Sequence, residues 1–169
     1  MQYRQQCELD LVMPRVTGLY GPNQHKGLNV LAQMDCAAVL SQLFDSPLQP
    51  AYRYEVTYVK DIARGVFTML DAPSLAHPVY NVGSGKQPTL EELTEVVRKF
   101  IPEADVRFGG SAQSDIPPRA LMAVDRFATE TGFRTAWIVE QGVRQLATWR
   151  RIGANGRPID HPPASAEEL

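Results

Sequence analysis

The sequence is poor in cysteine and has little net charge. Cys7 and Cys36 are its only cysteines, and without a C-x-x-C pair they argue against a disulfide scaffold or a zinc site and favour a reducing compartment. The formal net charge is −2 and there is no basic block, so we expect no binding to nucleic acid or to a membrane. No apolar run approaches the roughly 18 residues of a transmembrane span, and the polar N-terminus does not resemble a signal peptide. We therefore expect one cytoplasmic globular domain.

Clusters of metal-ligating or catalytic side chains are missing as well. The histidines are His25, His77 and His161, and none lies at metal-ligand spacing from another, so we expect no metal site. Asp61 has two interpretations, a general base or the cap of a following helix. The cap is favoured, because a carboxylate at that position can accept backbone N–H bonds. We expect no catalytic residue in this chain.

Glycine-rich phosphate-binding motifs are also absent. Residues 83–86 read Gly-Ser-Gly-Lys, but a phosphate loop needs an earlier glycine in place of Tyr80 and a Ser or Thr in place of Gln87. The dinucleotide pattern Gly-x-Gly-x-x-Gly fails because Pro88 stands at its third glycine position. We expect a tight strand-to-helix turn in which the glycines supply unusual φ angles.

Short apolar runs alternate with helical periodicity, which predicts an α/β fold. Strands are expected at residues 9–17, 54–59, 79–82 and 106–108. Helices are expected at residues 2–8, 29–44, 62–70, 89–100, 125–130 and 138–152. Thr89 and Glu92 match a capping box, and Asp125 is expected to cap the short helix after it. Residues 153–169 are rich in Pro, Gly, Ala and acid, so we expect a disordered tail there.

Several blocks of the sequence match one family in the right order. Residues 15–22 resemble the R-x-x-x-x-Y-G-P signature, residues 58–61 the Y-V-x-D segment and residues 80–85 the Y-N-x-G-x-G segment of the extended short-chain dehydrogenase/reductases. Residues 115–119 resemble the later G-D-x-P-x-R segment, and residues 131–133 the L-G-W that follows it. The chain thus resembles the NAD(P)-dependent sugar-nucleotide epimerase/dehydratase group.

The resemblance implies the C-terminal part of a doubly wound, Rossmann-like sheet plus a small α/β substrate-binding subdomain. The family's Gly-rich dinucleotide turn and catalytic Tyr-x-x-x-Lys are absent from the sequence. We therefore expect residues 1–152 to form the C-terminal, substrate-side region of such an enzyme. In the family, hydride passes to NAD or NADP while the Tyr moves a proton. We expect that chemistry to lie elsewhere, and this chain alone to bind the cofactor weakly or not at all.

The resemblance also assigns a cofactor-contacting loop. Val16, Thr17 and Gly18 take the positions that approach the nicotinamide ring in the family, and contact through the backbone is expected. The family often has Asn where this chain has Gly18, and that Asn grips the substrate. The assignment to a nucleotide sugar is weaker for this reason.

The expected substrate-binding residues are Arg53, Tyr54, Arg107 and Arg119. A planar arginine fork suits a diphosphate, but the two arginines usual in the family are not at their positions in this chain. Arg53 is offset by one residue, and alternation along a strand would direct it to the face opposite Tyr54. For all three arginines a solvated or salt-bridged structural role stays open. The substrate is expected to be a nucleotide sugar or a related small molecule.

The apolar run at residues 9–17 ends in a Gly-Pro turn, which is typical of a strand buried on both faces of a parallel sheet. Pro14 cannot donate to a ladder, so this strand should be short or irregular at its centre. With residues 79–82 it would leave apolar faces and backbone groups uncovered. We therefore expect a partner, either a missing N-terminal half or a second copy. The alternative to an enzyme part is a non-catalytic binding or self-association module.

Overall fold

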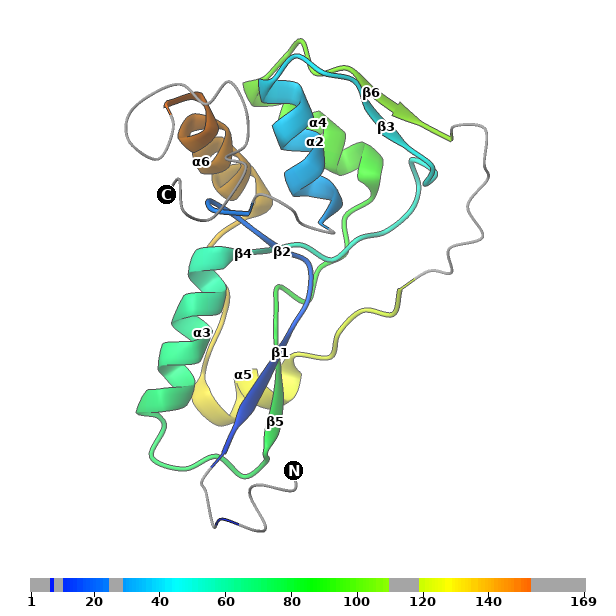
Figure 1. Cartoon of the computed structure of the whole chain (residues 1–169). Coiled ribbons are helices and arrows are strands. Elements are labelled where there is room, and N and C mark those ends of the chain that lie inside the picture. The colour runs from blue at the N-terminus through cyan, green and yellow to red at the C-terminus, as the bar shows by residue number, and fades with distance from the viewer. Residues whose placement is uncertain (1–6, 8–10, 25–28, 110–118, 153–169) are drawn as a thin grey trace.

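The computed structural model describes residues 7, 11–24, 29–109 and 119–152. Strands and helices alternate along this part of the chain (Figure 1). The strands are β1 (Met13–Val16), β2 (Leu19–Tyr20), β3 (Phe44–Ser46), β4 (Thr57–Tyr58), β5 (Val79–Val82) and β6 (Val106–Phe108). The helices are α2 (Val30–Val39), α3 (Val59–Asp71), α4 (Leu90–Phe100), α5 (Asp125–Thr131) and α6 (Val139–Ile152). The α/β prediction is confirmed.

The strands pair in parallel. β1 pairs with β5, β2 with β4 and β3 with β6, each as a two-stranded unit among the described residues. Parallel neighbours need a crossover connection, and helices lie between the two strands of each pair along the chain. This arrangement is Rossmann-like, as predicted. A separate small substrate-binding subdomain remains a prediction.

Two hydrophobic cores hold these elements together. In the larger core, α2, α4 and α6 pack together (Figure 1), and its fully buried side chains include Leu31, Met34, Leu90, Leu93, Val143 and Leu146. The smaller core joins β5, α5 and the segment after α5 through Tyr80, Val82, Phe127 and Phe133. Because β1 leads from beside β5 to Tyr20 of the larger core, the carboxyl ends of β1 and β5 point toward the junction of the two cores.

Helix α2 is shorter than predicted. Asn29 caps it by accepting hydrogen bonds from the N–H groups of Leu31 and Ala32, but the helix ends at Val39 and not at residue 44. Ser41 then adopts a φ of 53°, which breaks the helix, and the N–H of Phe44 donates to Asp105 at 2.9 Å. Phe44 is a buried residue of β3 and not of the helix, so the match of this apolar residue to the helical spacing is a coincidence.

Strand β1 is exposed along its length, so it is not buried on both faces among the described residues and is left uncovered, as expected for this segment. Met13 keeps 46% and Val16 43% of its surface accessible. The N–H of Met13 donates to the Pro78 carbonyl at 2.9 Å, and in this parallel register the backbone of Pro14 faces the opposite edge. Pro14 therefore removes no hydrogen bond of the ladder between β1 and β5, and the pairing of β1 is regular although the strand is short. It also removes a donor from an edge that pairs with no described strand.

The region around Asp61 also differs from the prediction. The expected strand at residues 54–59 is reduced to β4, and α3 begins directly after it at Val59. Asp61 lies inside the first turn and does not cap α3. Its carboxylate is buried and accepts hydrogen bonds from the N–H groups of Ala136 and Trp137 at 2.9 and 3.0 Å. Asp61 thus fastens α3 to the segment that precedes α6.

The remaining predictions had mixed outcomes. Thr89 and Glu92 form the expected capping box of α4, and β5, β6 and α6 lie close to their predicted bounds. Asp125 is the first residue of α5 and not its cap, which is Val124. Residues 153–169 and most of the predicted helix at residues 2–8 lie outside the described residues. Within the part of the chain that is described, no helix is long and apolar enough to cross a membrane.

Candidate functional site

Two loops leave the sheet side by side at the carboxyl ends of β1 and β5. Val16 and Val82 are register partners and are the last residues of these strands. The loop of Thr17 and Gly18 follows β1, and the turn of residues 83–86 follows β5. In open parallel α/β sheets, ligands bind outside the carboxyl ends of the strands. This strand-end site is therefore the first place to look for function.

Glu55 organises the strand-end site, and the sequence analysis did not single it out. Its side chain is buried, with Oε1 accepting from the N–H of Gly85 at 3.3 Å and Oε2 from the N–H of Met122 at 3.2 Å. Burial raises the pKa of the Glu55 carboxyl, and these two backbone donors oppose the rise. One carboxylate thus holds both the turn after β5 and the segment that leads from Arg119. The signal that could have revealed it is an acidic residue inside an apolar strand run.

The close approach of the loops depends on glycine. Gly18 has a φ of +57°, and a β-carbon on it would lie 1.6 Å from the carbonyl oxygen of Glu55. A β-carbon on Gly83 would lie 2.7 Å from Oε1 of Glu55. Thr57 completes the junction, because its N–H donates to Gly18 and its hydroxyl oxygen accepts from the N–H of Ser84, both at 2.9 Å. An Asn side chain in place of Gly18 has no room in this arrangement.

Three of the four predicted substrate-binding residues lie together beside this junction. The guanidinium of Arg119 lies 5.4 Å from the ring centroid of Tyr54. Gln87 connects the two arginines, since its carbonyl accepts from Arg53 at 2.9 Å and its side-chain amide donates to the Arg119 carbonyl at 3.0 Å. Arg53 is exposed and Tyr54 is buried, but both lie before β4 and residues 54–58 are all buried, so strand alternation is not the reason for the difference. Arg107 has different surroundings: it lies on β6 and pairs with Asp105 at 3.3 Å.

The arrangement suits binding of an anion. The exposed guanidinium groups of Arg53 and Arg119 can donate to phosphate or carboxylate oxygens. The sequence contains no Tyr-x-x-x-Lys, and the described residues contain no group of three or more His, Cys, Asp or Glu that could hold a metal ion. The predicted absence of a catalytic residue stays a prediction.

The described residues at the strand-end site do not fit a complete dinucleotide. A pyrophosphate needs a Gly-rich turn and open N–H groups at a helix N-terminus. The first turn of α4 follows the turn at residues 83–86, but Thr89 and Glu92 already close it as a capping box, and Glu91 adds a second carboxylate. Val16 and Thr17 offer only a limited surface, of which Val16 is exposed. We derive no reaction step through a bound dinucleotide.

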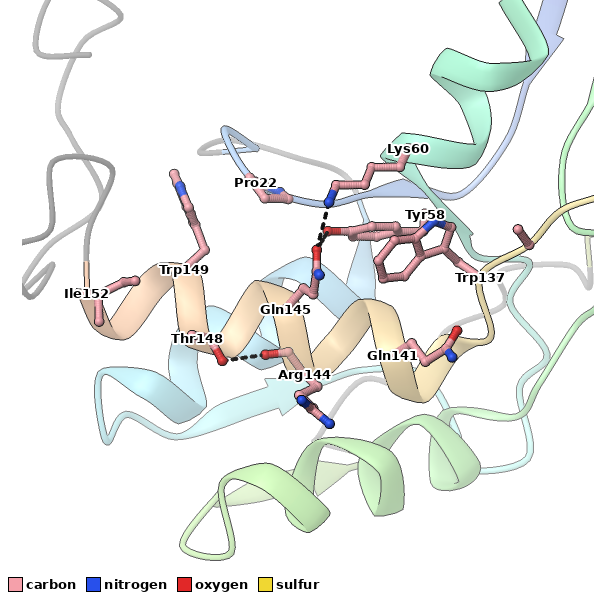
Figure 2. A pocket seen from close by; sticks show the side chains of 11 residues that line it. Pro22, Tyr58, Lys60, Trp137, Gln141, Arg144, Gln145, Thr148, Trp149 and Ile152 are labelled. Atoms are coloured by element: carbon pink, nitrogen blue, oxygen red, sulfur yellow. Dashed lines mark hydrogen bonds between the residues drawn. The ribbon is translucent and has the colours of Figure 1, made fainter. Parts of the chain in front are cut away.

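A large cavity in the described part of the chain lies elsewhere. It has a volume of about 900 Å³ and opens between α6 and the start of α3. Its lining includes Tyr58, Lys60, Trp137, Gln145 and Trp149 (Figure 2). None of the predicted cofactor- or substrate-binding residues lines it. The cavity is therefore a place where a ligand could bind apart from the strand-end site.

Known proteins share this fold. The model of the NAD dependent epimerase/dehydratase family matches residues 1–83. A curated protein of Oryza sativa subsp. japonica, probable GDP-L-fucose synthase 1, is 28% identical over 160 residues, which cover 87% of this chain and 47% of that protein. L-threonine 3-dehydrogenase from Trypanosoma brucei has a TM-score of 0.77 at 17% identity, over 93% of this chain and 51% of that one. UDP-glucuronic acid 4-epimerase from Bacillus cereus, in complex with UDP-glucuronic acid and NAD, has a TM-score of 0.76 at 15% identity, over 88% of this chain and 47% of that one.

These matches contradict the prediction that the chain is the C-terminal, substrate-side portion of such an enzyme. The family model matches the first 83 residues of the chain, and the structural matches cover 88% and 93% of the chain, so the similarity is to a Rossmann-like fold that includes the N-terminal half of this chain. At such low identities the structural likeness shows the fold alone. The chain spans about half the length of the curated relative it matches.

Proposed function

We propose that this chain, which is related to the NAD-dependent epimerase/dehydratase family through residues 1–83, binds the nucleotide part of a nucleotide sugar or a related small molecule at its strand-end site. It supplies binding and transfers no hydride by itself. The observation that carries the proposal is the meeting of Arg53, Tyr54 and Arg119 beside the loops that Glu55 joins.

The chemistry of these residues suits a nucleotide. A guanidinium is a planar fork that donates two parallel hydrogen bonds to a phosphate, and it stays charged at any physiological pH. Arg119 lies against Tyr54, which holds the guanidinium plane without neutralising it. Gln87 keeps Arg53 and Arg119 close through its two hydrogen bonds, one from the guanidinium of Arg53 and one to the backbone carbonyl of Arg119.

In this proposal, the cofactor NAD or NADP is bound only in part by this chain. Val16, Thr17 and Gly18 border the end of β1 and would contact only the nicotinamide end of a dinucleotide held mainly by other residues. The acid–base pair of the family, Tyr-x-x-x-Lys, would likewise come from another polypeptide or segment. Isolated, the chain should therefore bind NAD more weakly than about 1 μM, a level that corresponds to roughly 8 kcal/mol of binding free energy.

Calorimetric titration with UDP-glucose tests the proposal. We expect saturable binding that weakens about tenfold in Arg119→Ala, the loss of one charge-assisted contact. Arg107→Ala is the matched control, because Arg107 is an exposed arginine of β6 that pairs with Asp105. The affinity of this variant for UDP-glucose should equal that of the wild type. No saturable binding, or equal losses in the two variants, would contradict the proposal.

A second candidate function is a non-catalytic module that self-associates. The observation in its favour is the exposed apolar surface beside and on β1, where Leu11, Met13 and Val16 keep 42%, 46% and 43% of their surface accessible. Size-exclusion chromatography with light scattering separates the two functions. A stable dimer without affinity for UDP-glucose favours the module, whereas a monomer that binds the nucleotide sugar favours the binding function.

A further inference from the structure

The cavity of about 900 Å³ lies between the outward face of α6 and the junction of β4 and α3. Gln141, Gln145 and Trp149 follow one another at four-residue spacing along α6, so they line it from one helix face. Tyr58, Lys60 and Trp137 form the opposite wall, and Pro22 closes one side (Figure 2). Sites for small molecules commonly measure about 300–1,000 Å³, so the size suits a small organic ligand.

Aromatic rings make up much of the wall. The ring of Tyr58 packs against that of Trp137 at a centroid distance of 4.8 Å, which keeps both in place. Trp149 lies at the other end, with Ile152 one turn beyond it (Figure 2). Rigid, flat side chains of this kind recognise planar apolar groups through stacking and edge contacts. The lining therefore favours a ligand with a ring.

Lys60 gives the cavity a positive charge. Its ammonium group lies 5.0 Å from the ring centroid of Trp137 and donates to Oε1 of Gln145 at 3.0 Å. The same oxygen accepts from the hydroxyl of Tyr58 at 3.0 Å, so Gln145 fixes both groups. An ammonium has three donors and Gln145 accepts one of them. A ligand with acceptor oxygens can use the others.

The described lining of the cavity carries no negative charge: no Asp or Glu is among the described residues that line it. The carboxylate of Asp61, near the base of the wall, is already bound by Arg64 and by the N–H groups before α6. Glu140 of α6 pairs with Lys99 at 2.9 Å. Arg144 lines the cavity as well, although in Figure 2 it points away from Lys60.

We propose that this cavity is a binding site for a small aromatic anion, with its ring against Tyr58, Trp137 and Trp149 and its carboxylate or phosphate group on Lys60. The site is separate from the strand-end site and does not depend on the function proposed there.

The two tryptophans of the chain, Trp137 and Trp149, both line the cavity, so their indole N–H resonances report on it directly. Phenyl phosphate is the probe, with phenol as the ring without the charge and inorganic phosphate as the charge without the ring. We expect saturable shifts of both indole resonances with phenyl phosphate, and affinities about tenfold or more weaker for phenol and phosphate. Equal responses to all three compounds, or no saturation with phenyl phosphate, would overturn the proposal.

Two variants separate a role of Lys60 from a general effect of charge. Lys60→Gln should weaken phenyl phosphate about tenfold and leave phenol unchanged. Lys99→Gln makes the same change of charge on α4, where Lys99 pairs with Glu140, and should leave both affinities unchanged. Equal loss in the two variants would mean that the anion is attracted by net charge alone, which contradicts a built site.

Discussion

Gly18 and Glu55 are in direct backbone contact: a β-carbon on Gly18 would lie 1.6 Å from the carbonyl oxygen of Glu55. The contact exists because Gly18 adopts a φ of +57°, a left-handed conformation that costs other residues roughly 1–2 kcal/mol. It brings the loop after β1 onto the residue whose side chain holds the turn after β5. Much of the geometry of the strand-end site depends on this close contact between the backbones of Gly18 and Glu55.

Gly18→Ala should therefore lower the free energy of unfolding by about 3 kcal/mol or more, since backbone strain and a steric clash add. Urea unfolding followed by circular dichroism measures the change. Gly132→Ala is the control: Gly132 also has a positive φ of +72°, but a β-carbon there would meet nothing within 4 Å. Gly132→Ala should lower the free energy of unfolding by only about 1 kcal/mol. Equal losses would show that the contact with Glu55 has no energetic weight.

Replacing Glu55 by Gln should loosen both segments that its carboxylate holds. A Gln side chain keeps one acceptor oxygen, so the N–H of either Gly85 or Met122 loses its partner, at a cost of roughly 1–3 kcal/mol. Faster hydrogen exchange at these two amides, relative to wild type, checks the expectation. Glu95→Gln changes the same charge at an exposed position of α4 and should leave exchange at Gly85 and Met122 unaltered.

Asp61→Asn should separate α3 from the segment before α6. The buried carboxylate accepts from Ala136, Trp137 and Arg64, and the neutral amide cannot accept all three, so we expect a loss of about 2–3 kcal/mol. Thermal unfolding measures it. Asp71→Asn, at the exposed end of the same helix, should be neutral or slightly stabilising because a negative charge is unfavourable at a helix C-terminus. A neutral Asp61→Asn would contradict the fastening role.

The buried pair of Asp35 and Arg150 should make stability depend on pH. Burial raises the pKa of Asp35 to about 6, although Arg150 at 2.9 Å lowers it, and the Oδ1 atom of Asp35 has no hydrogen-bond partner among the described residues. Because this pKa lies above the ordinary value of 3.8, the folded state binds the proton more tightly than the unfolded state. Its contribution to stability is fully present below about pH 4 and is lost as the pH rises through about 6.

Asp35→Asn does not titrate and serves as the reference for this effect. The free energy of unfolding of the wild type minus that of the variant should fall by roughly 3 kcal/mol between pH 4 and pH 7. Urea unfolding of both proteins across this range gives the difference directly. A difference that is constant with pH, or that grows as the pH rises, would show that the pKa of Asp35 is not raised.

Local signals predicted the elements that depend on local chemistry. Thr89 and Glu92 lie three residues apart and satisfy each other's backbone donors, so the start of α4 could be located from the sequence. The end of α2 could not be located from the sequence. Phe44 is apolar because it is buried on β3, where its N–H donates to the carbonyl of Asp105, which is far away in the sequence. Pro14 predicts that β1 is short or irregular; β1 is short, and only the register with β5 shows that the backbone of Pro14 faces the open edge.

The strand-end site was partly predictable. Arg53, Tyr54 and Arg119 were chosen by resemblance and do lie together, although their binding role remains a prediction. Glu55 could not be chosen this way, because its partners Gly85 and Met122 lie 30 and 67 residues further along the chain. An acidic residue inside an apolar run could single out Glu55, but its partners are known only from the tertiary structure.

The most direct test of the account is a map of the amide resonances of the chain during titration with UDP. Binding at the strand-end site predicts saturable shifts at Gly18, Ser84, Gly85 and Met122, whether or not the indole resonances of Trp137 and Trp149 also shift. Shifts confined to the two indoles, or no saturable shift at the strand-end amides, would contradict the assignment of nucleotide binding to the ends of β1 and β5.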